Sequence, residues 1–133
     1  GDCTNFLLNS IHIRLESIQN AVDQAKVVAN NITGEIQNYD PVPWFWSDQF
    51  SLKLQIVGIS SKNKNIIKTI GSKEEAQFSN LVFDNNRLTS VETVNKPSHH
   101  IQFKNAYKYW KAIKPEMISK DLDLKSFFQK LHQ

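Results

Sequence analysis

The chain has 133 residues and a mass of 15.3 kDa, with 40% hydrophobic residues and a mean hydropathy of −0.44. A chain of this size forms one domain, or one domain and a piece of another. Its apolar runs are too short to span a membrane. The formal net charge is +3, but no recognised module accompanies it, which argues against nucleic acid as a partner.

Lysines supply most of the positive charge, and they are scattered: Lys62, Lys64 and Lys68 near the middle of the chain, and Lys104, Lys108, Lys111 and Lys114 further on. A solvated lysine-rich surface is the simplest interpretation of this pattern. The alternative is a surface that attracts an acidic partner.

The single cysteine, Cys3, cannot form an internal disulfide. This favours a reducing compartment, and we expect a cytoplasmic protein without a secretory leader. The sequence starts at Gly1, and its one methionine is Met117. A truncated chain or a fragment of a longer protein is therefore one interpretation.

A helix is the first element that the sequence predicts, over residues 17–32. Apolar and small residues recur there at helical spacing: Ile18, Val22, Ala25, Ala29 and Ile32. Ser17 suits the N-cap and Gly34 the position after the helix. The alanines on this face predict close packing against another element. The opening forty residues do not share the pattern of the rest of the chain, so we expect them to form a different layer.

Residues 35–49 predict an extended connector, because Pro41 and Pro43 disfavour helix. Four strands are then predicted from period-two patterns and turn residues, over residues 52–58, 66–70, 76–83 and 87–94. Gly58 and Gly71 are expected to end the first two. The turn residues 84–86, Asp-Asn-Asn, predict a hairpin between the last two.

Helical spacing returns after Pro97. One helical face before Pro115 is predicted to carry Phe103, Ala106, Tyr107, Trp110 and Ile113. A last short helix carries Leu124, Phe127, Phe128 and Leu131, with Asp121 or Asp123 as its cap. Strands followed by helices indicate an α+β fold, with an antiparallel sheet of four to five strands and C-terminal helices.

The residues that could bind metal or act as nucleophiles do not form a recognised motif. His99 and His100 are adjacent, and His12, His132 and Cys3 are far from them, so no metal site is predicted. Cys3 has no neighbouring base and no nucleophile elbow is present, so we assign no catalytic residue. The chain has four glycines and no glycine-rich phosphate-binding loop.

The stretch 41–49, PVPWFWSDQ, concentrates aromatic surface in nine residues. In extended backbone Trp44 and Trp46 project from one side and Phe45 from the other. Anchoring of a hydrophobic core is the simplest interpretation. The functional alternative is a flat platform for a conjugated ligand, held by the stiffness of Pro41 and Pro43.

A family resemblance adds to these patterns. The segment PVPWFWSDQFSLKLQIVG resembles the entry into the C-terminal domain of FAD-dependent, NAD(P)H-oxidising ferredoxin reductases of the putidaredoxin, rhodocoxin and biphenyl-dioxygenase type. Its Phe-Trp-Ser-Asp core is also similar to a stretch of apoptosis-inducing factor. Three further segments resemble the family: residues 1–3 the end of its Gly-Asp strand, residues 14–34 the next helix, and residues 90–97 its last strand.

The resemblance implies cofactor-binding roles for six residues. Asp2 would bond the FAD ribityl chain. The helix N-terminus at Ser17, Ile18 and Gln19 would face the flavin pyrimidine edge, since its first amides are unsatisfied. Trp46 would lie against the isoalloxazine, with Trp44 as a supporting neighbour. Ser47, Asp48 and Gln49 would hold the turn that follows.

The resemblance also implies a domain division and a reaction. Residues 1–40 would be the incomplete C-terminal end of an FAD-binding domain, with one helix left over from it, and residues 41–133 the reductase C-terminal domain. The whole enzyme would pass electrons from NAD(P)H through FAD to a ferredoxin-type iron–sulfur protein. The chain alone is expected to be inactive, because the glycine-rich loops of both dinucleotide folds are absent from it.

Two alternatives remain open. The chain could be a stand-alone, non-catalytic interaction module that docks an acidic partner, or, on the tryptophans alone, a binder of aromatic ligands. If helix 17–32 lacks its natural partner, its apolar face could pack on its own sheet, be disordered or produce a homodimer.

Overall fold

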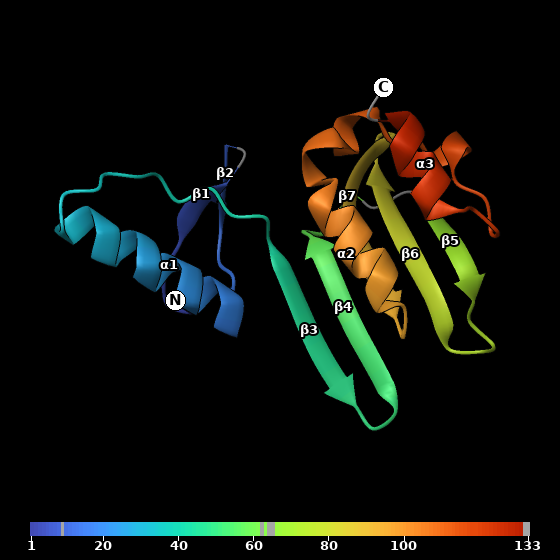
Figure 1. Ribbon diagram of the computed structural model, residues 1–133, viewed down its shortest axis with the longest axis horizontal. Coiled ribbons are helices and arrows are strands. Elements are labelled where there is room, and N and C mark those ends of the chain that lie inside the picture. The colour runs from blue at the N-terminus through green and yellow to red at the C-terminus, as the bar shows by residue number, and fades with distance from the viewer. Residues whose placement is uncertain (9, 62, 64–65, 132–133) are drawn as a thin grey trace. The chain divides into compact units, whose positions relative to one another are not determined.

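The computed structural model describes residues 1–8, 10–61, 63 and 66–131, so Lys62, Lys64 and His132 lie outside the described residues. It divides into two compact units, Gly1–Phe45 and Trp46–Gln133. Figure 1 colours the first unit blue to green and the second green to red.

The first unit contains a short hairpin and one long helix (Figure 1). Strands β1 (Phe6–Leu8) and β2 (Ile11–Ile13) pair antiparallel, with Leu7 opposite His12. Helix α1 (Ile18–Ile32) follows. The helix agrees with the sequence prediction, whereas the hairpin was not predicted. Three-residue strands are too short to show a clear alternation of polar and apolar residues.

The ends of α1 follow from its capping residues. The Ser17 side chain accepts a hydrogen bond from the Asn20 backbone N–H, which confirms Ser17 as the N-cap. At the other end Gly34 has a φ of 97°, a conformation that suits glycine. The amides of Thr33 and Glu35 bond to the carbonyls of Ala29 and Asn30, which satisfies the last helical turn.

Helix α1 turns polar side chains toward the rest of its unit. Asn20 is 3% exposed, and Gln24 bonds to Thr4 with Nε2 2.9 Å from Oγ1. The apolar stripe is exposed instead: Ile18, Val22, Ala25, Ala29 and Ile32. The prediction that this stripe packs closely against another element is therefore wrong for the described chain. Ile32 is 80% exposed.

The second unit is built on a five-stranded antiparallel sheet with the order β3-β4-β7-β6-β5 (Figure 1). Its strands are β3 (Trp44–Gln49), which crosses the boundary between the units, β4 (Leu52–Gly58), β5 (Ile66–Ser72), β6 (Gln77–Asp84) and β7 (Arg87–Val94). The α+β fold with a sheet of four to five antiparallel strands is thus confirmed.

Three details of the predicted connector, turn and strands are wrong. The expected connector over 35–49 ends at Pro43, because the aromatic residues that follow form edge strand β3. The turn after β3 is made by Phe50, whose φ is 54°, and Ser47, Asp48 and Gln49 lie within the strand rather than holding that turn. Gly71 lies inside β5, at a φ of 90°, instead of ending it.

The hairpin between β6 and β7 is confirmed. Asp84 pairs with Arg87, which leaves a two-residue turn of Asn85 and Asn86. Their φ values are 47° and 62°, the left-handed conformations that a type I′ turn requires. Asparagine tolerates this conformation better than other side-chain-bearing residues, so the sequence sets the register here.

The C-terminal segment contains two α-helices, α2 (Pro97–Asn105) and α3 (Leu124–Leu131), and two 3₁₀ helices, η1 (Tyr107–Ala112) and η2 (Pro115–Met117). The expected helical face from Phe103 to Ile113 is thus divided, because α2 ends at Asn105. The Trp110 indole donates to the Phe103 carbonyl at 3.0 Å. Asp123 is the cap of α3: its carboxylate accepts from the amides of Lys125 and Ser126.

These helices close a hydrophobic core over one face of the sheet (Figure 1). Phe83, Phe103 and Ile113 are each 0% exposed. The Phe103 ring makes edge contacts with Trp110 and Phe128, at centroid distances of 6.5 and 5.2 Å. Such aromatic pairs add stabilisation to that of the buried area itself, so the second unit has a complete core of its own.

Candidate functional site

The N-terminal turn of α1 presents unsatisfied donors. Within the described part of the chain, the amide N–H groups of Ile18 and Gln19 have no protein acceptor, as expected for the first positions of a helix. Ile18 is 68% exposed. The helix dipole adds partial positive charge at this end, so the turn can receive an electron-rich group.

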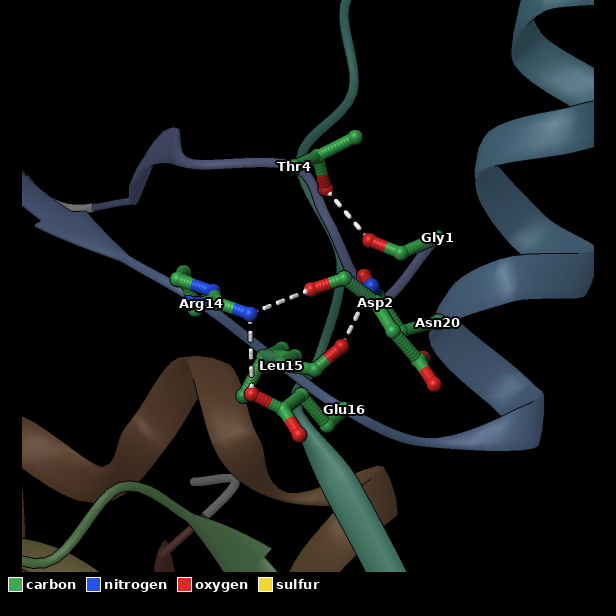
Figure 2. A network of polar contacts seen from close by, with 7 residues as sticks. All are labelled: Gly1, Asp2, Thr4, Arg14, Leu15, Glu16 and Asn20. Atoms are coloured by element: carbon green, nitrogen blue, oxygen red, sulfur yellow. Dashed lines mark hydrogen bonds and ion pairs between the residues drawn. The ribbon is translucent and has the colours of Figure 1, made fainter.

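Asn20 organises the residues around this turn. Its Nδ2 donates to the Leu15 carbonyl at 2.8 Å, and its Oδ1 accepts from the Tyr39 hydroxyl at 2.7 Å. Figure 2 shows the Asn20 amide directed at the Leu15 carbonyl, just before the helix begins. Both ends of this buried amide are therefore satisfied, which offsets the cost of burying it.

Tyr39 connects three parts of the first unit. Its hydroxyl reaches α1 through Asn20, and its ring contacts Phe6 of β1 edge-on, with centroids 5.0 Å apart. Burial, and then the negative charge of Asp23, raise the pKa of Tyr39 above its usual value. The phenol thus remains protonated and can donate to Asn20 throughout the physiological pH range.

A small cavity lies between the first turn of α1 and the segment that leads into β3. Its lining includes Ser17, Gln19, Tyr39, Pro43 and Trp44. The cavity measures about 10 Å³, which is room for one water and not for an aromatic ligand. The structure therefore brings Ser17, Gln19 and Trp44 together around a nearly filled space, and any larger ligand would lie on the surface of this turn.

The backbone of Asp2 is held by Arg14. Its carbonyl accepts from Arg14 Nη2 at 3.1 Å, and the same guanidinium nitrogen lies 3.1 Å from Glu16 Oε1 (Figure 2). Both ionic side chains are well exposed, so the ion pair contributes little to stability. Asp2 itself is exposed and does not line the cavity at α1.

Trp44 and Trp46 lie in edge strand β3, where both are half-buried and Phe45 between them is 41% exposed. This agrees with the expected alternation of a strand. Trp44 belongs to the first unit and Trp46 to the second. Gln49 Nε2 donates to Ser47 Oγ at 3.4 Å near the end of the same strand.

Asn20 and Tyr39, which join the first turn of α1 to the segment before Trp44, were not predicted from the sequence. A polar residue at the third helical position is common on exposed helices, so Asn20 gave no signal of burial. Tyr39 lay in a predicted connector, where a side-chain partner 19 residues away cannot be read from spacing.

The described ranges contain neither a group of metal ligands nor a membrane-spanning helix. In residues 1–8, 10–61, 63 and 66–131 no group of three metal-ligating side chains comes together. Nor do these residues include a helix with the length and apolar character needed to cross a membrane.

The chain was compared with known proteins. Residues 44–128 match the family described as Reductase C-terminal. Rhodocoxin reductase of Rhodococcus erythropolis is 38% identical over 94% of this chain and 30% of its own length. Putidaredoxin reductase of Pseudomonas putida is 33% identical over 89% of this chain and 28% of its own length.

Solved structures agree with these relatives. A ferredoxin reductase from Rhodopseudomonas palustris matches with a TM-score of 0.86 and 38% identity, over 96% of this chain and 32% of the other. The covalent complex of putidaredoxin reductase with putidaredoxin matches with a TM-score of 0.87 and 30% identity, over 99% and 32%.

The fold and these matches define a class of protein domain over residues 44–128, the C-terminal domain of reductases. The chain belongs to the reductase C-terminal family. It spans about 30% of the length of the curated relatives it matches, so the activity of a whole reductase is a proposal for this chain.

Proposed function

We propose that this chain is the C-terminal part of a flavoprotein that passes electrons from NAD(P)H through FAD to a ferredoxin-type iron–sulfur protein. The observation that carries the proposal is the match to rhodocoxin reductase, 38% identical over 94% of the chain. In the proposed division, residues 1–40 end the FAD-binding domain, and residues 41–133 form the reductase C-terminal domain. The chain alone is inactive in this account.

The donors on α1 are compatible with a flavin. The pyrimidine edge of an isoalloxazine carries carbonyl and ring-nitrogen acceptors, and it becomes more electron-rich on reduction. The amides of Ile18 and Gln19 at the N-cap Ser17 supply two unsatisfied donors and a favourable dipole. When bound, the flavin supplies the redox chemistry, and the chain's residues orient it.

The remaining proposed cofactor residues are Asp2, Trp44 and Trp46. Asp2 is exposed, so its carboxylate is available to a ribityl hydroxyl. Trp46 would lie against the flavin ring and Trp44 beside it. Trp44 shares a cavity with Ser17 and Gln19, which supports its role as a neighbour of the flavin edge. These assignments depend on motif position in the family.

A ferredoxin-type protein is the proposed electron acceptor. Putidaredoxin reductase, a relative, forms a covalent complex with putidaredoxin that has been crystallised. In this chain residues 96–114 carry five lysines and no acidic residue: Lys96, Lys104, Lys108, Lys111 and Lys114. Such a segment would favour an acidic partner and make the association sensitive to salt. The single exposed Cys3 is compatible with a reducing, cytoplasmic location.

A homodimer through α1 is the proposed behaviour of the isolated chain. The exposed stripe that includes Val22 and Ile32 would be covered by a second copy in the absence of other polypeptide. The interaction-module alternative predicts instead a chain that binds an acidic protein without any flavin.

A chimera tests the proposed function. The C-terminal 30% of rhodocoxin reductase, which this chain matches, is replaced by residues 1–133, and the purified chimera is assayed for bound FAD and for NAD(P)H oxidation. Retention of FAD and turnover with an artificial acceptor support the proposal. A folded chimera without flavin contradicts it. Intact rhodocoxin reductase is the positive control, and the 133-residue chain alone should show no turnover.

A further inference from the structure

Asn20 is an unusual residue in the first unit, because its polar side chain is only 3% exposed. Its amide is paired at both ends, with Leu15 O 2.8 Å from Nδ2 and Tyr39 Oη 2.7 Å from Oδ1. Turning the amide over would place Oδ1 against the Leu15 carbonyl, acceptor to acceptor, so that carbonyl fixes one orientation.

Contacts from two other segments add to the cap of the first turn of α1. The Leu15 carbonyl lies two residues before the cap, the Asn20 backbone N–H bonds to Ser17 Oγ at 3.2 Å, and Tyr39 comes from the segment that leads to Trp44. The Tyr39 ring is itself positioned by Phe6. The turn therefore has little freedom to tilt or unwind.

The same connector is also tied to the far end of α1. Asn31 Nδ2 donates to the Gln37 carbonyl at 3.1 Å, and the Gln37 amide donates to Asn31 Oδ1 at 2.7 Å. Those contacts are exposed and hold the C-terminal end of α1. The buried contact between Asn20 and Tyr39 is the one that joins the connector to the first turn.

We infer that Asn20 and Tyr39 are positioning residues for the flavin contact: they fix the direction of the Ile18 and Gln19 amides and tie it to the segment bearing Trp44. This inference rests on the proposed function. Functional groups need supporting contacts of this kind, because a donor that can tilt loses most of its directional hydrogen bonding. Neither residue touches the flavin in this account.

The first test uses the whole 133-residue chain without flavin. Tyr39→Phe removes one hydroxyl and keeps the ring against Phe6, and Tyr107→Phe makes the same change in the second unit. Backbone amide NMR shifts are measured for Ile18 and Gln19. We expect both amides to shift in Tyr39→Phe only. Unchanged amides would overturn the inference.

The second test uses the rhodocoxin reductase chimera. Loss of one partner of a buried hydrogen bond typically changes an equilibrium by roughly tenfold. We therefore expect Tyr39→Phe to weaken FAD binding roughly tenfold and to shift the flavin reduction potential, with Tyr107→Phe unchanged in both. A lower thermal midpoint with an unchanged potential and FAD affinity would mean a purely structural role and would overturn the inference.

The two tests separate this inference from the proposed function. If the unsubstituted chimera folds without flavin, the proposed function fails, and with it the flavin role of the pair. The amide measurements on the chain then still decide whether Asn20 and Tyr39 fix the first turn of α1.

Discussion

The two units of this chain use their apolar residues in opposite ways. In the second unit the helices bury their aromatic residues against the sheet, and Phe103 is 0% exposed. In the first unit α1 faces its own unit with Asn20 and Gln24 and leaves Ile32 80% exposed. A helix normally buries its apolar stripe. The difference shows that the second unit has a buried core of its own, whereas the described residues of the first unit leave the apolar stripe of α1 uncovered.

The largest expected effect is at the core of the second unit. Phe103→Ala should lower the free energy of unfolding by about 3–5 kcal/mol, because it leaves a cavity among packed aromatic side chains. Ile32→Ala, at an exposed position, should change it by no more than about 0.5 kcal/mol. Urea unfolding followed by tryptophan fluorescence measures both. Similar losses of unfolding free energy in the two variants would contradict the contrast between the two units.

A second prediction contrasts two glycines. Gly58 has a φ of 82°, and a Cβ there would clash with the Thr89 carbonyl oxygen and lie 2.8 Å from Trp110 Cζ3. Gly34 has a φ of 97° but nothing within 4 Å. Gly34→Ala should therefore cost about 1 kcal/mol from backbone strain alone. Gly58→Ala should cost clearly more, because Trp110 must also move. Thermal unfolding of both variants measures the difference. Equal losses of stability would show that the core around Trp110 can rearrange at little energetic cost.

The stability of the second unit should also depend on pH. Burial first, and then the neighbouring charges of Lys96 and Lys104, lower the pKa values of His99 and His100 below 6.5. The unfolded chain then takes up protons first as the pH falls. The contribution of His99 and His100 to folding stability is fully present above pH 6.5 and is lost as the pH drops through their lowered pKa values.

Thermal midpoints between about pH 8 and about pH 5 test this. We expect the midpoint to fall across that interval, and the slope to become shallower when His99 and His100 are both replaced by Gln. His99 Nδ1 lies 2.9 Å from Ser79 Oγ, and Gln retains a polar group near that hydroxyl. An unchanged slope would assign the effect to other groups.

The smallest expected effect concerns the exposed stripe of α1. Val22 is 43% exposed in the first unit, and Met117, at 44%, is a matched position in the second. Val22→Glu should reduce concentration-dependent self-association of the chain, and Met117→Glu should not. Light scattering at increasing protein concentration measures this. A monomer at every concentration would remove the homodimer proposal and leave the stripe to other polypeptide.

Much of the fold could be predicted from the sequence, because local signals coincide with it. Asn85 and Asn86 give the β6–β7 turn, Ser17 and Gly34 bound α1, and Asp123 caps α3. The break after Asn105 could not be predicted, since it accompanies a tertiary hydrogen bond from Trp110 to a carbonyl seven residues back. Periodicity alone continues the helix through that point.

Less of the candidate site than of the fold could be predicted from the sequence. The family motif named Trp44, Trp46 and the helix start, but the first turn of α1 is joined to the segment before Trp44 by a contact between residues 20 and 39. Such a contact has no periodic or compositional signal. Asn20 is typical of an exposed helical surface in the sequence, and only the three-dimensional structure shows that it is buried.

The most direct test of the account is a crystal structure of the rhodocoxin reductase chimera with FAD bound. The decisive distances run from the amide nitrogens of Ile18 and Gln19 to the acceptors on the flavin pyrimidine edge. The account predicts that at least one amide lies within hydrogen-bond distance, about 3.2 Å or less. A flavin bound with its pyrimidine edge directed away from α1 would contradict it.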